Sequence, residues 1–224
     1  MTDFAQTYGE LRERVAQVVR RADPAALEAY APATPEWRVR DLLAHLTGVA
    51  ADVNAGNLDG VATDAWTARQ VAARRDRTVP HLLDEWDTEG RKLDAAIPQF
   101  PEVAAGQLIA DAATHEHDIR GGLDTPGARD SDAVTIAESW MVQMLGPRLD
   151  AADASVRIDD GDEEITVGTG PRQLGLTTSR FELMRAMTGR RSVEQMREYK
   201  WHCDPEPELL VLSLFTPRPT PLVE

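Results

Sequence analysis

Helical periodicity is the feature that most constrains what this chain can fold into. Along roughly the first 150 residues, apolar side chains recur every three or four positions, in segments separated by prolines, glycines and short polar stretches. This spacing predicts amphipathic helices, each burying one face against its neighbours. The predicted long helices cover residues 3–22, 39–53, 80–97, 105–123 and 131–149, with a shorter one at 65–75.

Prolines and glycines mark where these helices begin and end. Pro32 and Pro35 interrupt the chain after the first helix, since proline disfavours helix at its own position and at the one before. Pro80 suits the first turn of a helix, and the pair Gly121-Gly122 suits a helix end. Arg38 stands where a hydroxyl side chain would cap the helix at 39–53, so we expect the capping box to be incomplete.

The pattern changes after Leu149. Residues 154–159 and 164–168 alternate apolar and polar side chains across Asp160-Gly161-Asp162, which predicts a β-hairpin. Two short helices, 179–188 and 193–199, and an apolar strand at 209–215 are expected to follow. We therefore predict a mainly α protein with a smaller α+β part: a helical bundle over 1–150 and a small α+β domain over 151–224.

The composition limits which classes of partner and which compartment suit the protein. The chain has 224 residues, with 24 basic and 38 acidic side chains and a net charge of −14, which disfavours nucleic acid and anionic membranes. Its single cysteine, Cys203, excludes an intramolecular disulfide and fits a reducing compartment. The N-terminus does not resemble a signal peptide, and no apolar run reaches membrane-spanning length. We expect a cytoplasmic monomer or homodimer acting on small molecules.

Two helices place ionisable groups on their apolar sides. Asp111 and His115 are four residues apart, so they lie within about 40° of each other on one helix face. His45 lies beside the apolar stripe of the helix at 39–53. Burying an imidazole and a carboxylate costs free energy unless they are paired or bind a cation. The alternative is a hydrogen-bonded core histidine at 45 and an ordinary helix-surface pair at 111 and 115.

Two residues next to this set differ in their predicted roles. His117 points about 200° away from His115, so we expect a solvated histidine that does not share the helix face of Asp111 and His115. Asp118 returns to the face of Asp111, where it can orient a ligand or contact substrate. A salt bridge at the end of the helix is the alternative for Asp118.

These residues and their neighbours resemble the mycothiol-dependent maleylpyruvate isomerases, a branch of the DinB-like metal-binding four-helix bundles. The resemblance implies a metal site of His45, Asp111 and His115, with Asp111 where the family more often has the longer Glu. A three-ligand site with nitrogen and oxygen donors keeps open positions, and Zn²⁺ or another divalent metal suits it. The matching segments are Trp37 with Val39-Arg40-Asp41, His45-Leu46, Asp118-Ile119 and residues 179–192.

The resemblance also implies an activity. The bound metal would lower the pKa of the thiol of mycothiol, which then adds to a cis double bond, allows rotation and leaves as the trans isomer forms. The same thiolate suits an S-transferase. The family uses an arginine of the second domain at the active site, and Arg190 and Arg191 can hold a carboxylate bidentately. The alternative for Arg190 and Arg191 is that they are ordinary surface charges. Competing candidates for the active-site arginine are Arg180, Arg185, Arg197 and Arg218.

A second class of function stays open. A DinB-like bundle can also be a non-catalytic protein that binds a small ligand or a partner, with a structural or vestigial metal site. Asp111 in place of Glu and Arg38 in place of a cap favour this alternative slightly. Cys203, followed by Asp204-Pro205, lacks the basic surroundings of a nucleophile, so we interpret it as a bystander thiol.

Overall fold

The computed structural model describes residues 3–202 and 213–224, and the chain divides into two compact units: residues 1–127 together with Glu224, and residues 128–223. Every helix predicted for the first unit is present, with ends within a few residues of the predicted ones. Within the described residues, no helix is long and apolar enough to cross a membrane. The helices of the first unit are α1 (Phe4–Arg21), α2 (Pro24–Leu27), α3 (Val39–Ala55), α4 (Asp64–Arg74), α5 (Val79–Ala96), the 3₁₀ turn η1 (Ile97–Gln99) and α6 (Glu102–Gly122).

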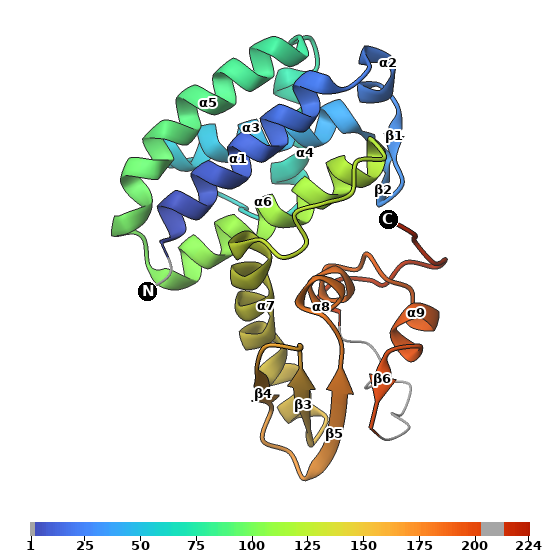
Figure 1. Ribbon diagram of the computed structural model, residues 1–224. Coiled ribbons are helices and arrows are strands. Elements are labelled where there is room, and N and C mark those ends of the chain that lie inside the picture. Colours follow the sequence, from blue (N-terminus) through green and yellow to red (C-terminus); the bar gives the residue numbers. More distant parts are fainter. Residues whose placement is uncertain (1–2, 203–212) are drawn as a thin grey trace. The chain divides into compact units, whose positions relative to one another are not determined.

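The first unit is a helical bundle built around α3. This helix packs against α4, α5 and α6, and α1 packs against α5 and α6 (Figure 1). Leu42 and Leu43 of α3, Leu82 of α5 and Ile109 of α6 are almost completely buried. Burial of each such side chain contributes roughly 1.5–3 kcal/mol, so the predicted apolar stripes hold the bundle together.

A short β-hairpin precedes α3 and was not predicted. Strands β1 (Tyr30–Ala31) and β2 (Thr34–Arg38) pair antiparallel where the prolines had indicated only an interruption. The backbone N–H of Arg38 donates to the Asp41 carboxylate over 2.9 Å, so Asp41 supplies its half of the capping box. Strand β2 therefore runs directly into α3 and places Trp37 beside the first turns of that helix.

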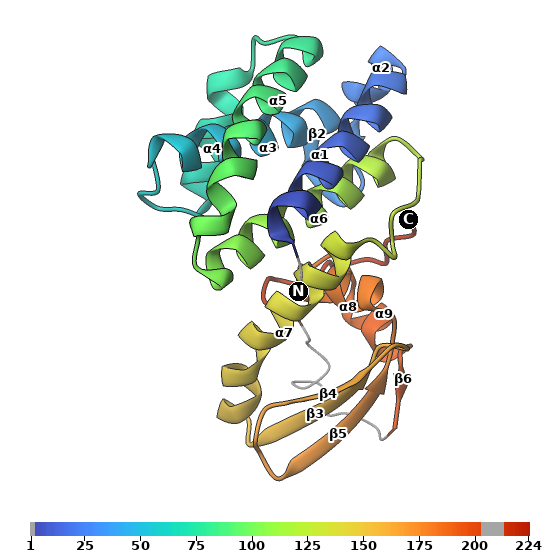
Figure 2. The same ribbon diagram turned by 60° about the vertical axis from the view of Figure 1, so that its left-hand side comes forward.

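The second unit combines helices with a four-stranded sheet of order β4-β3-β5-β6 (Figure 2). The predicted hairpin is confirmed, since β3 and β4 pair antiparallel. The unpredicted β5 pairs parallel to β3, and α7 packs on α8, β3 and β4. Its elements are α7 (Asp132–Ala151), β3 (Ala154–Asp159), β4 (Glu164–Val167), β5 (Arg172–Thr177), α8 (Arg180–Met187), α9 (Val193–Arg197) and β6 (Lys200–Trp201).

Two expectations for this half of the chain need comment. The compact units divide at residues 127 and 128, one helix before the boundary that we expected near residue 150. The change of periodicity after Leu149 marks where the strands begin. Helix α7 nevertheless belongs to the second unit, because it packs on the sheet and on α8. The strand expected at 209–215 falls mainly outside the described residues, and its described part, 213–215, is not a strand.

Candidate metal centre

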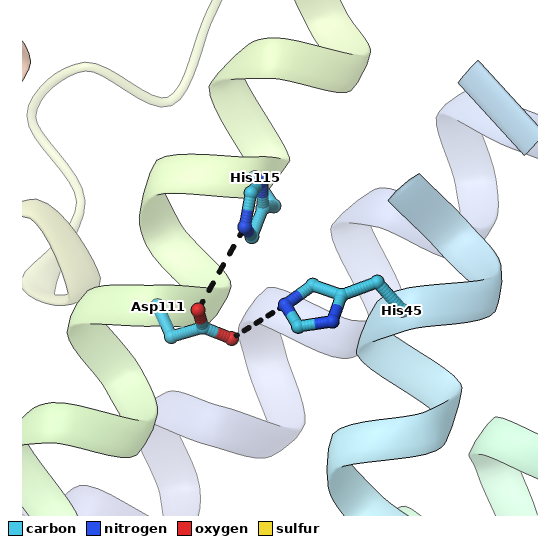
Figure 3. Close-up of side chains that lie close together, drawn as sticks. All are labelled: His45, Asp111 and His115. Carbon is cyan, nitrogen blue, oxygen red and sulfur yellow. Dashed lines mark ion pairs between the residues drawn. The ribbon is translucent and has the colours of Figure 1, made fainter. Parts of the chain in front are cut away.

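Helices α3 and α6 bring His45, Asp111 and His115 together in the first unit. One potential ligand atom from each residue lies within 4.8 Å of the others. Nε2 of His45 is 3.5 Å from Oδ2 of Asp111, and Nε2 of His115 is 3.7 Å from Oδ1 (Figure 3). Ligand atoms in a tetrahedral Zn²⁺ site lie about 3.3–3.6 Å apart, so the arrangement fits a divalent metal after small side-chain movements.

The three side chains differ in burial. The imidazoles of His45 and His115 are 3% and 12% exposed, whereas the Asp111 carboxylate is 35% exposed. The nitrogen donors are therefore held inside the bundle. An accessible side at the carboxylate is what a metal with open coordination positions requires.

Both imidazoles use their second nitrogen within the protein. Nδ1 of His45 lies 2.8 Å from Oε1 of Gln70, and Nδ1 of His115 lies 3.0 Å from Oδ2 of the fully buried Asp118. Histidines that bind metals commonly donate the other ring N–H to such a partner, which fixes the ring and its tautomer. Asp118 is therefore placed to orient His115, which is one of the roles predicted for it.

Burial also affects the protonation of His115. Desolvation lowers the pKa of His115 from its usual 6.5, and Asp118 and Asp111 oppose this shift only in part. The imidazole is therefore neutral at pH 7. A neutral imidazole has a lone pair on Nε2, which is the form that binds a metal.

Trp37 covers one side of the two histidines. Its ring centroid is 5.4 Å from that of His45 and 6.1 Å from that of His115, and its plane is within 17° of the latter ring. Trp37 also lines an open cavity of about 850 Å³. The other lining residues are Tyr30, Glu36, Arg38, Asp41, Asp64, Thr67, Ala68, Val71, Ala72 and Arg75.

Comparison with known proteins agrees with this geometry. Residues 8–120 match the model of the mycothiol maleylpyruvate isomerase N-terminal domain, which covers half of the chain. The chain belongs to this family. The match includes all three candidate ligands, so the resemblance expected from the motifs is confirmed.

Solved structures extend the likeness across both units. The crystal structure of a mycothiol-dependent maleylpyruvate isomerase superposes with a TM-score of 0.62 at 12% identity, covering 93% of this chain and 96% of that one. A histidine-to-alanine mutant of that enzyme gives a TM-score of 0.58 at 11% identity, with the same coverage. At such identity the likeness shows the fold, which confirms the predicted fold class. No curated protein matches the chain.

Two residues of this family member differ from our expectations. His117 is only 4% exposed, so the prediction of a solvated histidine is wrong. Helix α6 packs against both α1 and α3 and therefore buries more than one face. Gln70, which is 2% exposed and contacts His45, was missed because nothing in the sequence of α4 distinguishes it from a surface glutamine.

The predicted arginines of the second unit have local partners. Nε and one terminal nitrogen of Arg191 donate to the Glu182 carboxylate over 2.7 and 2.8 Å, and Arg191 is 3% exposed. The half-buried Arg190 donates to the carbonyl of Thr188 over 2.7 Å. For Arg191 these contacts favour a structural role, because binding a ligand carboxylate would first break a bidentate ion pair.

Proposed function

We propose that this member of the mycothiol maleylpyruvate isomerase family is a metal- and thiol-dependent enzyme. Its substrate would be an electrophilic or unsaturated small molecule, and its reaction isomerisation or thiol transfer. The observation that carries the proposal is that two imidazoles direct Nε2 to one carboxylate, while both Nδ1 atoms are bonded to the protein. This arrangement supports a three-ligand catalytic metal site.

The residues of the chain would act as follows. His45, Asp111 and His115 hold Zn²⁺ or another divalent metal, and Asp118 keeps His115 in the ligating orientation. When bound, the metal supplies a lowered thiol pKa and so a thiolate at neutral pH. Of the two arginines predicted for the second unit, we propose Arg190 rather than Arg191 for a substrate carboxylate, because Arg191 already forms a bidentate ion pair with Glu182.

We propose mycothiol as the external thiol, because the chain belongs to the mycothiol maleylpyruvate isomerase family. A reducing, cytoplasmic compartment suits the reaction, since the thiol must stay reduced. Isomerisation and S-transfer share the formation of a thiolate adduct and differ in whether the thiol leaves again. A non-catalytic binding protein is the alternative class, and the 35% exposure of Asp111 supports an accessible metal over a purely structural one.

Metal content and turnover test this proposal together. We expect purified protein to bind about one divalent metal per chain, and His45→Ala and His115→Ala each to lose most of it. His81→Ala is the matched control, since His81 is exposed. Metal-loaded protein should convert at least one member of an electrophile panel that includes maleylpyruvate, and only when mycothiol is added. Full metal retention in both ligand variants would overturn the site.

A further inference from the structure

We propose that Gln70 and Asp52 fix the tautomer of His45 and thereby direct its Nε2 lone pair into the metal site. Gln70 connects the two residues: its Oε1 lies 2.8 Å from Nδ1 of His45, and its Nε2 lies 2.8 Å from Oδ2 of Asp52. Gln70 is 2% exposed, so water cannot easily replace either contact. The part of this inference that concerns the metal rests on the proposed function.

Hydrogen-bond polarity carries the argument from Asp52 to His45. An ionised carboxylate only accepts, so the side of Gln70 that faces Asp52 must be its NH₂ group. The carbonyl oxygen of Gln70 then faces His45 and can also only accept. Nδ1 of His45 must therefore carry the hydrogen, which leaves Nε2 without one in the neutral ring.

The bare Nε2 faces an oxygen of Asp111 over 3.5 Å. Two lone pairs opposed in this way repel each other unless a proton or a cation lies between them. His115 presents its own Nε2 to the other oxygen of the same carboxylate. The hydrogen-bond chain from Asp52 thus prepares a cluster of acceptors that a divalent cation would stabilise.

A glycine in α3 leaves room for the side chain of Gln70. His45, Gly48 and Asp52 are three and four residues apart, so they lie along one face of the helix. A Cβ placed on Gly48 would lie 2.5 Å from Cβ and 2.7 Å from Cγ of Gln70, which is closer than atoms pack. Glycine at this position lets α4 approach and lets Gln70 bridge the other two residues.

Histidine tautomers in the metal-free protein provide the direct test. With ¹⁵N-labelled histidine, NMR at pH 8 should show His45 in the Nδ1–H form in the wild-type protein. Gln70→Leu should give a mixture of tautomers, while exposed His81 stays unchanged as the internal control. An unaltered His45 tautomer in folded Gln70→Leu would overturn the proposal.

An exchange variant keeps the test decisive if Gln70→Leu fails to fold. Gln70→Glu combined with Asp52→Asn swaps the carboxylate and the amide but keeps the net charge. The bond from Nδ1–H of His45 is kept, because the carboxylate at 70 only accepts. The bond between the two exchanged residues reverses: in the wild type Gln70 donates to Asp52, whereas in the variant the amide at 52 donates to the carboxylate at 70. We expect this double variant to retain the Nδ1–H tautomer; the Nε2–H tautomer there would contradict the inference.

Metal affinity gives the second readout, independent of activity. Titration with Zn²⁺ or Co²⁺ should show about 10- to 100-fold weaker binding in Gln70→Leu, and recovery in the double variant. Equal affinity in wild type and folded Gln70→Leu would overturn the positioning role. If the wild-type protein bound neither metal, the proposed function would fail, and the NMR result would still decide whether Gln70 sets the tautomer.

Discussion

At the scale of single residues, the candidate metal site depends on which nitrogen of each imidazole already has a hydrogen-bond partner in the protein. Sequence spacing was sufficient to place Asp111 and His115 on one helix face, because i and i+4 positions superpose on any α-helix. The contact of His45 with Gln70 was not predictable, because it joins two helices through a polar side chain with no periodic signature. His117 was misjudged for a similar reason, since spacing gives its direction but not what packs there.

The lowered pKa of His115 predicts a pH effect at this scale. A histidine whose folded-state pKa lies below its unfolded value of 6.5 costs stability as pH falls through that range, because only the unfolded chain takes up the proton readily. Chemical denaturation of the metal-free protein from pH 8 to 5 should therefore show a loss that His115→Gln lacks. An identical pH dependence in the two proteins would contradict the prediction.

Glu138 should shift stability in the opposite direction. This carboxyl is 1% exposed, and burial together with the nearby charge of Asp160 raises its pKa to about 7. Its ionised form is therefore disfavoured in the folded state, and stability should rise as pH falls through 7. Glu138→Gln should be more stable than wild type by about 1–3 kcal/mol at pH 8 and similar at pH 5. A less stable variant at pH 8 would refute this.

At the scale of elements, helices were predictable and isolated strands were not. Helices α1, α3 and α5 have a clear 3.6-residue apolar period, and their ends carry proline, glycine or a capping residue. Helix α6 buries more than one face, so the residues at its ends mark it better than its period does. In contrast, β5 contains Gln173 and Gly175, so its apolar and polar residues do not alternate clearly. It pairs parallel to β3, so no tight hairpin turn next to it predicts a strand either. The hairpin of β1 and β2 was hidden because β1 is only two residues long.

The close approach of α3 and α4 gives a prediction for these elements. Gly48→Ala should destabilise the protein by about 1–3 kcal/mol, because the new methyl group meets the stem of Gln70 and not a mobile side-chain end. It should also weaken metal binding by moving Gln70 away from His45. Gly9→Ala is the control: it lies within α1, its nearest neighbour is 3.8 Å from an added Cβ, and alanine there should stabilise slightly. Equal stability of the two variants would argue against tight α3–α4 packing.

At the scale of the whole molecule, the family assignment and the fold class were both accessible from the sequence. The motifs around His45 and Asp118 led to the family, and the family model covers 8–120 of the first unit. The division between units was not accessible, because it depends on where α7 packs and not on its own pattern. The substrate was not predictable for a similar reason, because it depends on which side chains contact the ligand and not on the pattern of any one helix.

The source of the nucleophile distinguishes an enzyme of the proposed kind from one that uses its own cysteine. Cys203 lies outside the described residues, and its sequence context lacks a basic cluster. Turnover should therefore require added mycothiol, should survive Cys203→Ser nearly unchanged, and should be abolished by Asp111→Ala because the metal would lose its carboxylate ligand. Initial rates with and without the thiol, measured on metal-loaded proteins, check all three outcomes. Turnover without any thiol, or its loss in Cys203→Ser with metal still bound, would show that the nucleophile belongs to the protein.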